Sequence, residues 1–102
     1  MAFPRSHLYN DRDQKTSFFF KALGHPARLK IIRKLKRDGP CTVNVLHKWH
    51  PISLPSLSQH IGILRRAHIL DFKEKYPYTY YSLNPKNYQK VKHILKSFLE
   101  EM

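Results

Sequence analysis

The amino-acid sequence predicts a mainly helical domain with one β-hairpin placed just before its last helix. Apolar residues recur at helical spacing in successive segments, Gly and Pro mark most of the breaks between them, and alternating stretches lie only near residues 69–83. The chain has 102 residues, of which 41% are hydrophobic, and this suffices for one domain with a single core. The expected order is four helices, a hairpin and a final helix.

Residues 1–12 are polar and are expected to form a flexible N-terminal arm ahead of the single domain, residues 13–102. A helix is predicted from Asp13, as its N-cap, to Leu23. Its three consecutive phenylalanines cannot all face one core, because neighbouring helix positions lie about 100° apart. A second subunit is the economical explanation of this surplus aromatic surface.

Two more helices follow, separated by the stop Gly39-Pro40. The first begins at Pro26 and ends near Asp38. The second is short, is capped by Thr42 and ends before Pro51. The expected inner side of the first helix is Leu29, Ile32 and either Leu35 or Lys36, helped by Ile31. In the second helix it is Val43, Leu46 and Trp49.

The most informative stretch is residues 53–67, which predicts a helix with Ser53 as N-cap and Pro55 in its first turn. Its outer side carries serines, glutamine, glycine and two arginines without a carboxylate, which suits base edges and phosphates as well as it suits solvent. A short helix and a turn precede it, which is the helix-turn-helix arrangement with the second helix as reader. The expected buried stripe is Leu57, Ile61 and Leu64.

Residues 69–75 and 79–83 predict two strands, joined by a turn with Pro77 in its second position. This hairpin would be a wing whose Lys73 and Lys75 can reach the DNA backbone or minor groove.

The last helix is predicted to begin after Asn84, its N-cap, and to carry a wide apolar stripe from Tyr88 to Leu99. The complete order, α-α-α-α-β-β-α, is that of a winged helix-turn-helix domain.

The charge balance favours a polyanionic partner. Lys and Arg number 19 against 7 acids, a net charge of +12, with nucleic acid as the leading partner and an anionic membrane surface as the second. No apolar leader segment is seen and no stretch approaches a membrane span, so an intracellular, cytoplasmic protein without membrane contact is expected.

Enzyme activity is not expected, since the sequence has only three glycines and no phosphate loop, paired-carboxylate pattern or nucleophile elbow. His47 and His50 have a spacing that a metal site can use, but no thiol or carboxylate accompanies them, and exposed or capping roles are expected instead. No cofactor or metal is therefore predicted. His60 is expected to bond backbone or wing, and His68 to be structural. A buried, inert thiol is expected at Cys41 in preference to a redox switch.

The segment from Phe19 to Asn84 resembles the ArsR/SmtB family of transcriptional repressors. ALGHPARLKII is similar to that family's ALADPTRLRIL opening, and SLPSLSQHIGILRRAHIL to its SQSTVSHHLKVLREAGLV reader segment. Tyr80-Tyr81 followed by Ser82-Leu83 resembles the VYYRL ending of its wing. About two-thirds of the chain is covered, in the family's order and spacing.

The resemblance implies a homodimer, built from the first and last helices, that represses a promoter reversibly and binds double-stranded DNA. The implied dimer-interface residues are Phe18, Phe19, Phe20, Tyr88, Val91, Leu95 and Phe98. The implied DNA-binding residues are Leu54, Pro55, Ser56, Ser58, Gln59, Arg65, Lys73 and Lys75.

Departures from the family pattern leave the inducer unknown. The Cys-x-Cys positions of its arsenic and cadmium sensors hold Thr42 and Asn44 here, and its zinc and nickel ligand set on the last helix is reduced to His93. Gly62 inside the reader helix and His68 after it are also unusual for the family.

Two other functions remain open at this point. One is a winged-helix module that binds nucleic acid without sequence preference, which the charge of +12 supports. The other is a dimeric interaction module without DNA function.

Overall fold

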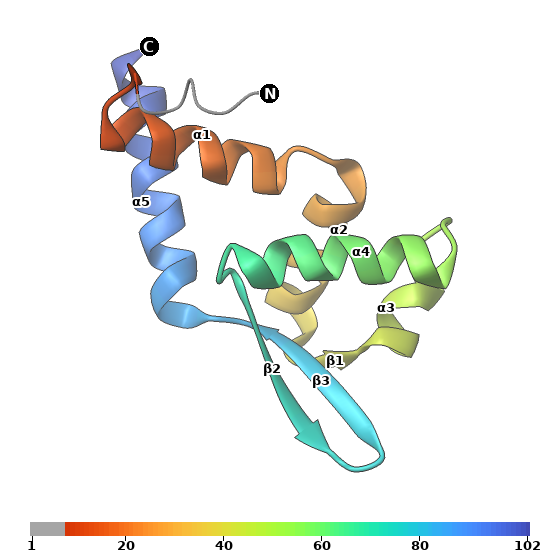
Figure 1. The fold of residues 1–102 in the computed structure, drawn as a ribbon. Helices are drawn as coiled ribbons and strands as arrows, with labels where there is room; N and C mark the ends of the chain where they lie inside the picture. Colours follow the sequence, from red (N-terminus) through yellow and green to blue (C-terminus); the bar gives the residue numbers. More distant parts are fainter. Residues whose placement is uncertain (1–7) are drawn as a thin grey trace.

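The computed structural model describes residues 8–102, so residues 1–7 of the expected arm lie outside the described part. Its order confirms a mainly helical domain with a β-hairpin wing (Figure 1). The elements are α1 (Asp11–Leu23), α2 (Pro26–Asp38), β1 (Cys41–Thr42), α3 (Val43–Lys48), α4 (Leu54–Arg66), β2 (Leu70–Lys75), β3 (Tyr78–Leu83) and α5 (Pro85–Glu101).

Helix α1 begins earlier than the sequence predicted. Asn10 is its N-cap, because the side-chain oxygen of Asn10 accepts a hydrogen bond of 2.7 Å from the backbone amide of Asp13. The prediction of Asp13 as the cap was therefore wrong. Asp11 and Asp13 lie in the first turn instead, where a negative charge favours the helix dipole.

The other helix starts follow the sequence closely. Thr42, Ser53 and Asn84 are the N-caps of α3, α4 and α5, and each accepts a hydrogen bond from the amide three residues further on. At α2 the ring Nδ1 of His25 takes this role and accepts from the amide of Ala27 at 3.0 Å.

A third strand, β1, was not predicted. It joins the hairpin in an antiparallel sheet of order β1-β3-β2, with Cys41 opposite Tyr81. A strand of two residues carries no alternating pattern, so only the approach of β3 reveals it. The wing itself pairs Leu70 with Leu83 at its base and Lys75 with Tyr78 at its tip.

The wing turn consists of Tyr76 and Pro77, between the ends of β2 and β3. Pro77 follows a cis peptide bond and takes the third position of the turn rather than the predicted second. A turn with a cis proline in that position is a known class, which the sequence pattern alone did not separate from the commoner turns.

The core lies where α4 crosses α2 and α3. The predicted stripe of α4 is confirmed, because all three of its residues are buried. The largest fully buried side chains are Ile31, Leu46, Leu57, Leu64 and Ile69.

Two predicted core residues lie at the surface instead. Leu29 is 40% exposed, because α2 turns Ala27, Ile31 and Leu35 toward the core. Trp49 is 51% exposed. It caps the C-terminus of α3, and a position six residues after Val43 lies about 240° around the helix, away from the inner side.

The corner between α4 and the wing is a Schellman motif. The amide of His68 donates to the carbonyl oxygen of Arg65 at 2.9 Å, and the amide of Ile69 donates to that of Leu64 at 3.0 Å. His68 therefore has φ of 60°, a left-handed conformation that favours glycine. This explains the glycine that the resembled family commonly has here, and it confirms a structural position for His68.

We predict that His68→Gly raises the free energy of unfolding by roughly 1 kcal/mol, because glycine adopts the left-handed conformation without steric strain. Urea denaturation followed by circular dichroism measures it. His68→Ala is the control, since it removes the imidazole but keeps a Cβ, and it should give no gain. Equal stabilisation by both substitutions would show that loss of the ring, not backbone strain, is responsible.

Candidate nucleic-acid interface

The predicted reading residues lie at the N-terminal end of α4. Leu54, Pro55, Ser58 and Gln59 are exposed, and Ser56 is half-buried. The hydroxyl of Ser53 accepts from the amide of Ser56 at 3.3 Å and donates to the Ser56 hydroxyl at 3.1 Å. Because the Ser56 oxygen accepts this bond, its own hydrogen is free to donate outward.

The N-terminal end of α4 lies beside α3 (Figure 1). In the same view the wing lies below α4 and extends away from the helices. The opposite side of α4 is held in the core by Leu57, Ile61 and Leu64, which fixes the rotation of the helix about its axis. The described geometry thus presents a short, polar and exposed helix end without a carboxylate on it.

Arg65 is positioned by an aromatic contact with the wing. Its guanidinium carbon lies 4.0 Å from the ring centroid of Phe72 on β2. Arg65 and Lys73 line the same hollow, between the end of α4 and the base of the wing. Two predicted phosphate contacts are thereby brought together, and Phe72, which sequence reasoning missed, holds one of them in place.

Lys73 and Lys75 are exposed and lie two residues apart on β2, so they share one face of the wing. Asp71 precedes them on the same face. Its two carboxylate oxygens accept hydrogen bonds of 3.0 and 3.1 Å from the Asn84 side-chain amide at the base of the wing. Among the described residues, Asp71 is thus the only carboxylate on this face of the wing, and its hydrogen bonds hold it at the base, away from the tip.

Gly62 has a visible structural consequence. A Cβ placed on it would lie 3.2 Å from Nη1 of Arg66, because the Arg66 side chain folds back over this position. The glycine therefore makes room for a guanidinium within α4 itself.

The sequence predicted that His60 bonds the backbone or the wing, and this prediction was wrong. Nη1 of Arg28 donates to its Nδ1 at 3.1 Å, and its ring lies against that of His25 with centroids 4.2 Å apart. Burial lowers the pKa of His60, and the neighbouring His25 and Arg28 lower it further. The contact was invisible in the sequence because Arg28 lies 32 residues away.

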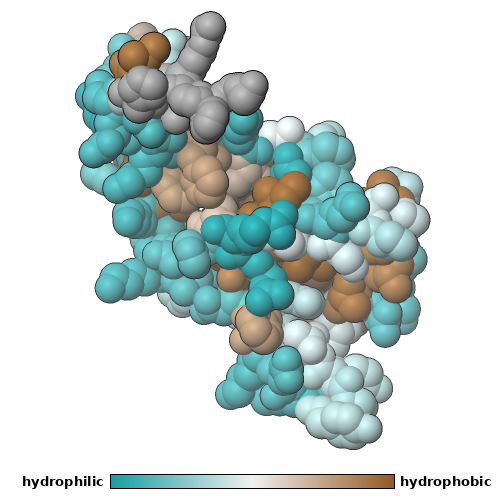
Figure 2. Space-filling model, in the orientation of Figure 1, coloured by the Kyte–Doolittle hydropathy of each residue, from teal (hydrophilic) through white to brown (hydrophobic). Residues whose placement is uncertain are grey.

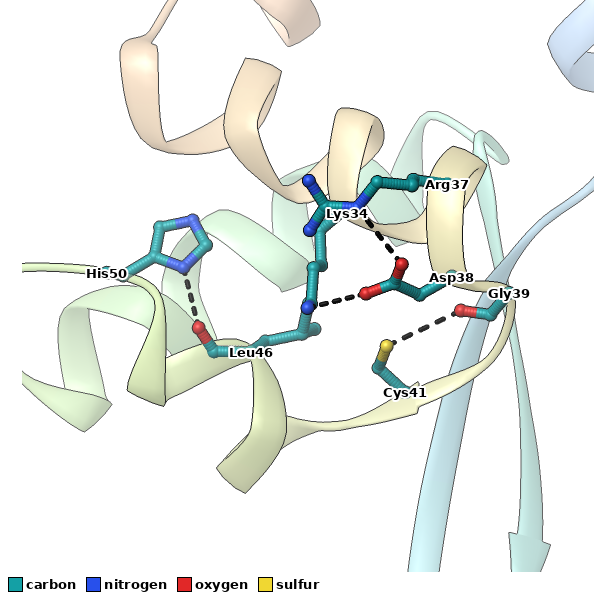
Figure 3. A network of polar contacts seen from close by, with 7 residues as sticks. All are labelled: Lys34, Arg37, Asp38, Gly39, Cys41, Leu46 and His50. Atoms are coloured by element: carbon teal, nitrogen blue, oxygen red, sulfur yellow. Dashed lines mark hydrogen bonds and ion pairs between the residues drawn. The ribbon is translucent and has the colours of Figure 1, made fainter.

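His47 and His50 stabilise the turn between α3 and α4. The Nε2 of His47 lies 2.9 Å from the carbonyl oxygen of Ile52 across the turn. His50 is buried, with its Nδ1 2.7 Å from the carbonyl oxygen of Leu46 (Figure 3) and its Nε2 3.2 Å from that of Ala27. The capping role expected for these histidines agrees with these contacts.

Cys41 is buried in the core, and its thiol donates to the carbonyl oxygen of Gly39 at 3.4 Å (Figure 3). Burial raises the pKa of the Cys41 thiol, which disfavours the reactive thiolate. The expected inert thiol agrees with this placement.

Within residues 8–102, no three His, Cys, Asp or Glu side chains lie close enough together to hold a metal ion. None of the helices in this range has the length and apolar character that a membrane-spanning helix needs.

The predicted dimer residues differ in exposure. Phe19 and Val91 are buried in the core of the chain itself, whereas Phe18 is 50% exposed. Phe20 and Phe98 are also partly exposed and pack against each other edge to face, with centroids 5.6 Å apart. Tyr88 and Leu95 are half-buried on α5.

Comparison with known proteins points in one direction. A helix-turn-helix domain family matches residues 23–71. The chain is 40% identical over 65 residues to the transcriptional repressor SdpR of Bacillus subtilis, across 64% of this chain and 71% of that protein. It is 32% identical over 100 residues to the arsenic resistance transcriptional regulator ArsR1 of Pseudomonas putida, across 97% of this chain and 76% of that protein.

Solved structures agree with the sequence comparison. The transcriptional repressor BigR from Xylella fastidiosa matches with a TM-score of 0.70 and 27% identity, covering 96% of each chain. A possible transcriptional regulator for arsenical resistance matches with a TM-score of 0.72 and 26% identity, covering 78% of this chain and 82% of that one.

The lowered pKa of His60 predicts a pH-dependent stability. The unfolded chain takes up a proton near the usual value of 6.5, whereas folded His60 does so only at lower pH. The stabilisation is therefore complete above pH 6.5 and is lost as pH falls toward the folded pKa. Thermal melts from pH 7.5 to 5 should show a shallower decline for His60→Asn, which keeps an acceptor for Arg28, than for the wild type. His93→Asn, at an exposed position, is the control, and an unchanged slope in His60→Asn would contradict the assignment.

Proposed function

The chain belongs to the ArsR/SmtB family of winged helix-turn-helix transcriptional regulators, and from this premise we propose that it is a homodimeric repressor that reads an inverted repeat through α4. It is a DNA-binding transcriptional regulator, as its relatives are. The observation that carries the finer proposal is the exposed N-terminal end of α4, which the core fixes in rotation. The exposed Lys73 and Lys75 of the wing add two positive charges on one face of β2. Its place of action would be the cytoplasm.

In this proposal the residues at the start of α4 read base edges. Gln59 bonds an adenine edge with both atoms of its amide, and Leu54 packs on a thymine methyl. Ser56 and Ser58 add hydroxyl donors beside them, and Pro55 contacts the groove. Arg65, Lys73 and Lys75 bind phosphates, which sets register and affinity rather than sequence choice.

The dimer is supported by apolar surface on α1 and α5. The two helices are joined by the contact between Phe20 and Phe98 and by an ion pair of Arg12 with Glu101. Phe18 of α1 and Leu99 of α5 are at least half exposed. A two-fold pairing through this face places two copies of α4 on half-sites about one or two helical turns apart.

A soft-metal inducer is not part of the proposal. The positions at which the family's arsenic sensors carry cysteines hold Thr42 and Asn44, and the single cysteine of the chain is buried with a raised pKa. One inaccessible thiol cannot supply the two or three thiolates that such an ion requires.

We predict that Gln59→Ala and Arg65→Ala affect DNA binding differently. The first should relax preference at one base pair by about 1–3 kcal/mol, and the second should weaken binding to all sequences alike and flatten its salt dependence. Fluorescence anisotropy with the DNA upstream of the gene and with a scrambled duplex, over a salt series, measures both. Equal losses on the two duplexes for both variants would contradict these roles.

We predict that Leu99→Asp weakens the dimer at least about tenfold, because it places a charge in the apolar face that two copies would bury. Analytical ultracentrifugation over a concentration series gives the dissociation constant. Val45→Asp is the matched control, since Val45 is a partly exposed apolar residue on α3, away from α1 and α5. A dimer that Leu99→Asp leaves intact would overturn the proposed interface.

A further inference from the structure

A hollow between α1, α2 and the C-terminal half of α4 lies apart from the reading end of α4 and from the wing. Its volume is about 410 Å³, within the range in which proteins bind small molecules. It is contained in one chain and is lined by Phe18, Lys21, Ala22, Arg28, Ile63 and Arg66.

The lining combines apolar walls with positive charge. Phe18, Ala22 and Ile63 supply the apolar part, while three cations and no carboxylate supply the polar part. Figure 2 shows apolar side chains gathered between α1 and α4 on this face, with hydrophilic ones beside them. A ligand that matches both features has an apolar body and a negatively charged head group.

Arg28 carries an unsatisfied donor at this place. Its Nη1 donates to His60 and its Nη2 donates to the carbonyl oxygen of Lys21 at 3.3 Å. Its Nε is buried and has no acceptor. A buried donor of a charged group without an acceptor is unfavourable, and Arg28 is a lining residue of the hollow, so its guanidinium favours an anionic ligand there.

Arg66, which lines the hollow, folds back over the glycine one turn before it. Its Nη1 lies 3.2 Å from the place where a Cβ at position 62 would stand. A Cβ there would require the flexible end of the Arg66 side chain to shift slightly, so the glycine lets the guanidinium lie close to the helix.

The apolar walls distinguish this hollow from a phosphate contact. DNA phosphates and inorganic phosphate gain nothing from a wall of phenylalanine, isoleucine and alanine, whereas a hydrocarbon or aromatic body does. The competing occupant is a side chain of a second copy, because Phe18 also belongs to the proposed dimer face.

We propose that the hollow between α1, α2 and α4 binds a small organic carboxylate with an apolar body. The carboxylate meets Arg28 and Arg66, and the body packs on Phe18, Ala22 and Ile63. The occupied site would bridge a helix of the proposed dimer face and the reader helix, so the ligand would act as an effector. Only this effector role rests on the proposed function; binding itself does not.

Isothermal titration calorimetry of the full chain with octanoate tests binding without DNA. One octanoate per chain is expected, with hexanoate about sixteenfold weaker, since each buried methylene contributes about fourfold. Octanol, which has the same body without the charge, should bind at least about tenfold more weakly. Equal affinity for octanoate and octanol, or binding that inorganic phosphate abolishes, would overturn the proposal.

Arg66→Gln should weaken octanoate binding at least about tenfold. Arg65→Gln is the matched control, because it removes the same charge from the neighbouring position without lining the hollow, and it should change the affinity less than about twofold. Wild-type affinity in Arg66→Gln would contradict the site.

Two further measurements distinguish the remaining possibilities. If octanoate binds the Leu99→Asp variant at a concentration where that variant is monomeric, but not the wild-type dimer, a partner side chain is the occupant and the proposal is wrong. Saturating octanoate should change the affinity for operator DNA at least about fivefold in the wild type. An unchanged DNA affinity would overturn the effector role, whereas failure of the wild type to prefer any DNA sequence would instead contradict the proposed function.

Discussion

The burial of one side of α4 is the constraint on which the rest of the structure depends. Leu57, Ile61 and Leu64 pack into the core against α2 and α3, and Leu57 and Leu64 have no exposed surface. Because helix positions are fixed at about 100° intervals, this one contact also decides that Ser58 and Gln59 face outward. The reading surface is thus a consequence of the core, and a rotation of α4 by a single residue would bury polar groups and expose leucines.

Among the described residues, more of the cationic side chains contact aromatic rings than form ion pairs with acids. Among the described residues three ion pairs are formed, two of them with Asp38. Arg65 instead lies over Phe72, and Lys92 lies over the ring of Tyr88, 5.5 Å from its centroid. An aromatic ring orients a cation without neutralising it. Most of the +12 charge is therefore available to a polyanion.

Features that depend on a few neighbouring residues could be predicted from the sequence. Ser53 and Asn84 cap their helices as expected, and the stripe of α4 is buried, because caps and helical periodicity act over three to seven residues. Features that depend on distant partners could not. The strand at Cys41 needs β3, and the contact of His60 needs Arg28. Nothing local to these residues distinguishes them from a loop residue and an ordinary surface histidine.

The C-terminal half of α4 and the corner after it depart twice from what backbone stability alone favours. Gly62 lies inside the helix, where glycine costs about 0.5–1 kcal/mol relative to alanine, and His68 takes the left-handed position that glycine fills more easily. The two residues are thus placed against their ordinary preferences within one short stretch. Gly62 lets the guanidinium of Arg66, a lining residue of the hollow, lie close over α4. Local instability combined with a retained cation and an unsatisfied donor is the pattern of a binding site rather than of a solvated helix face.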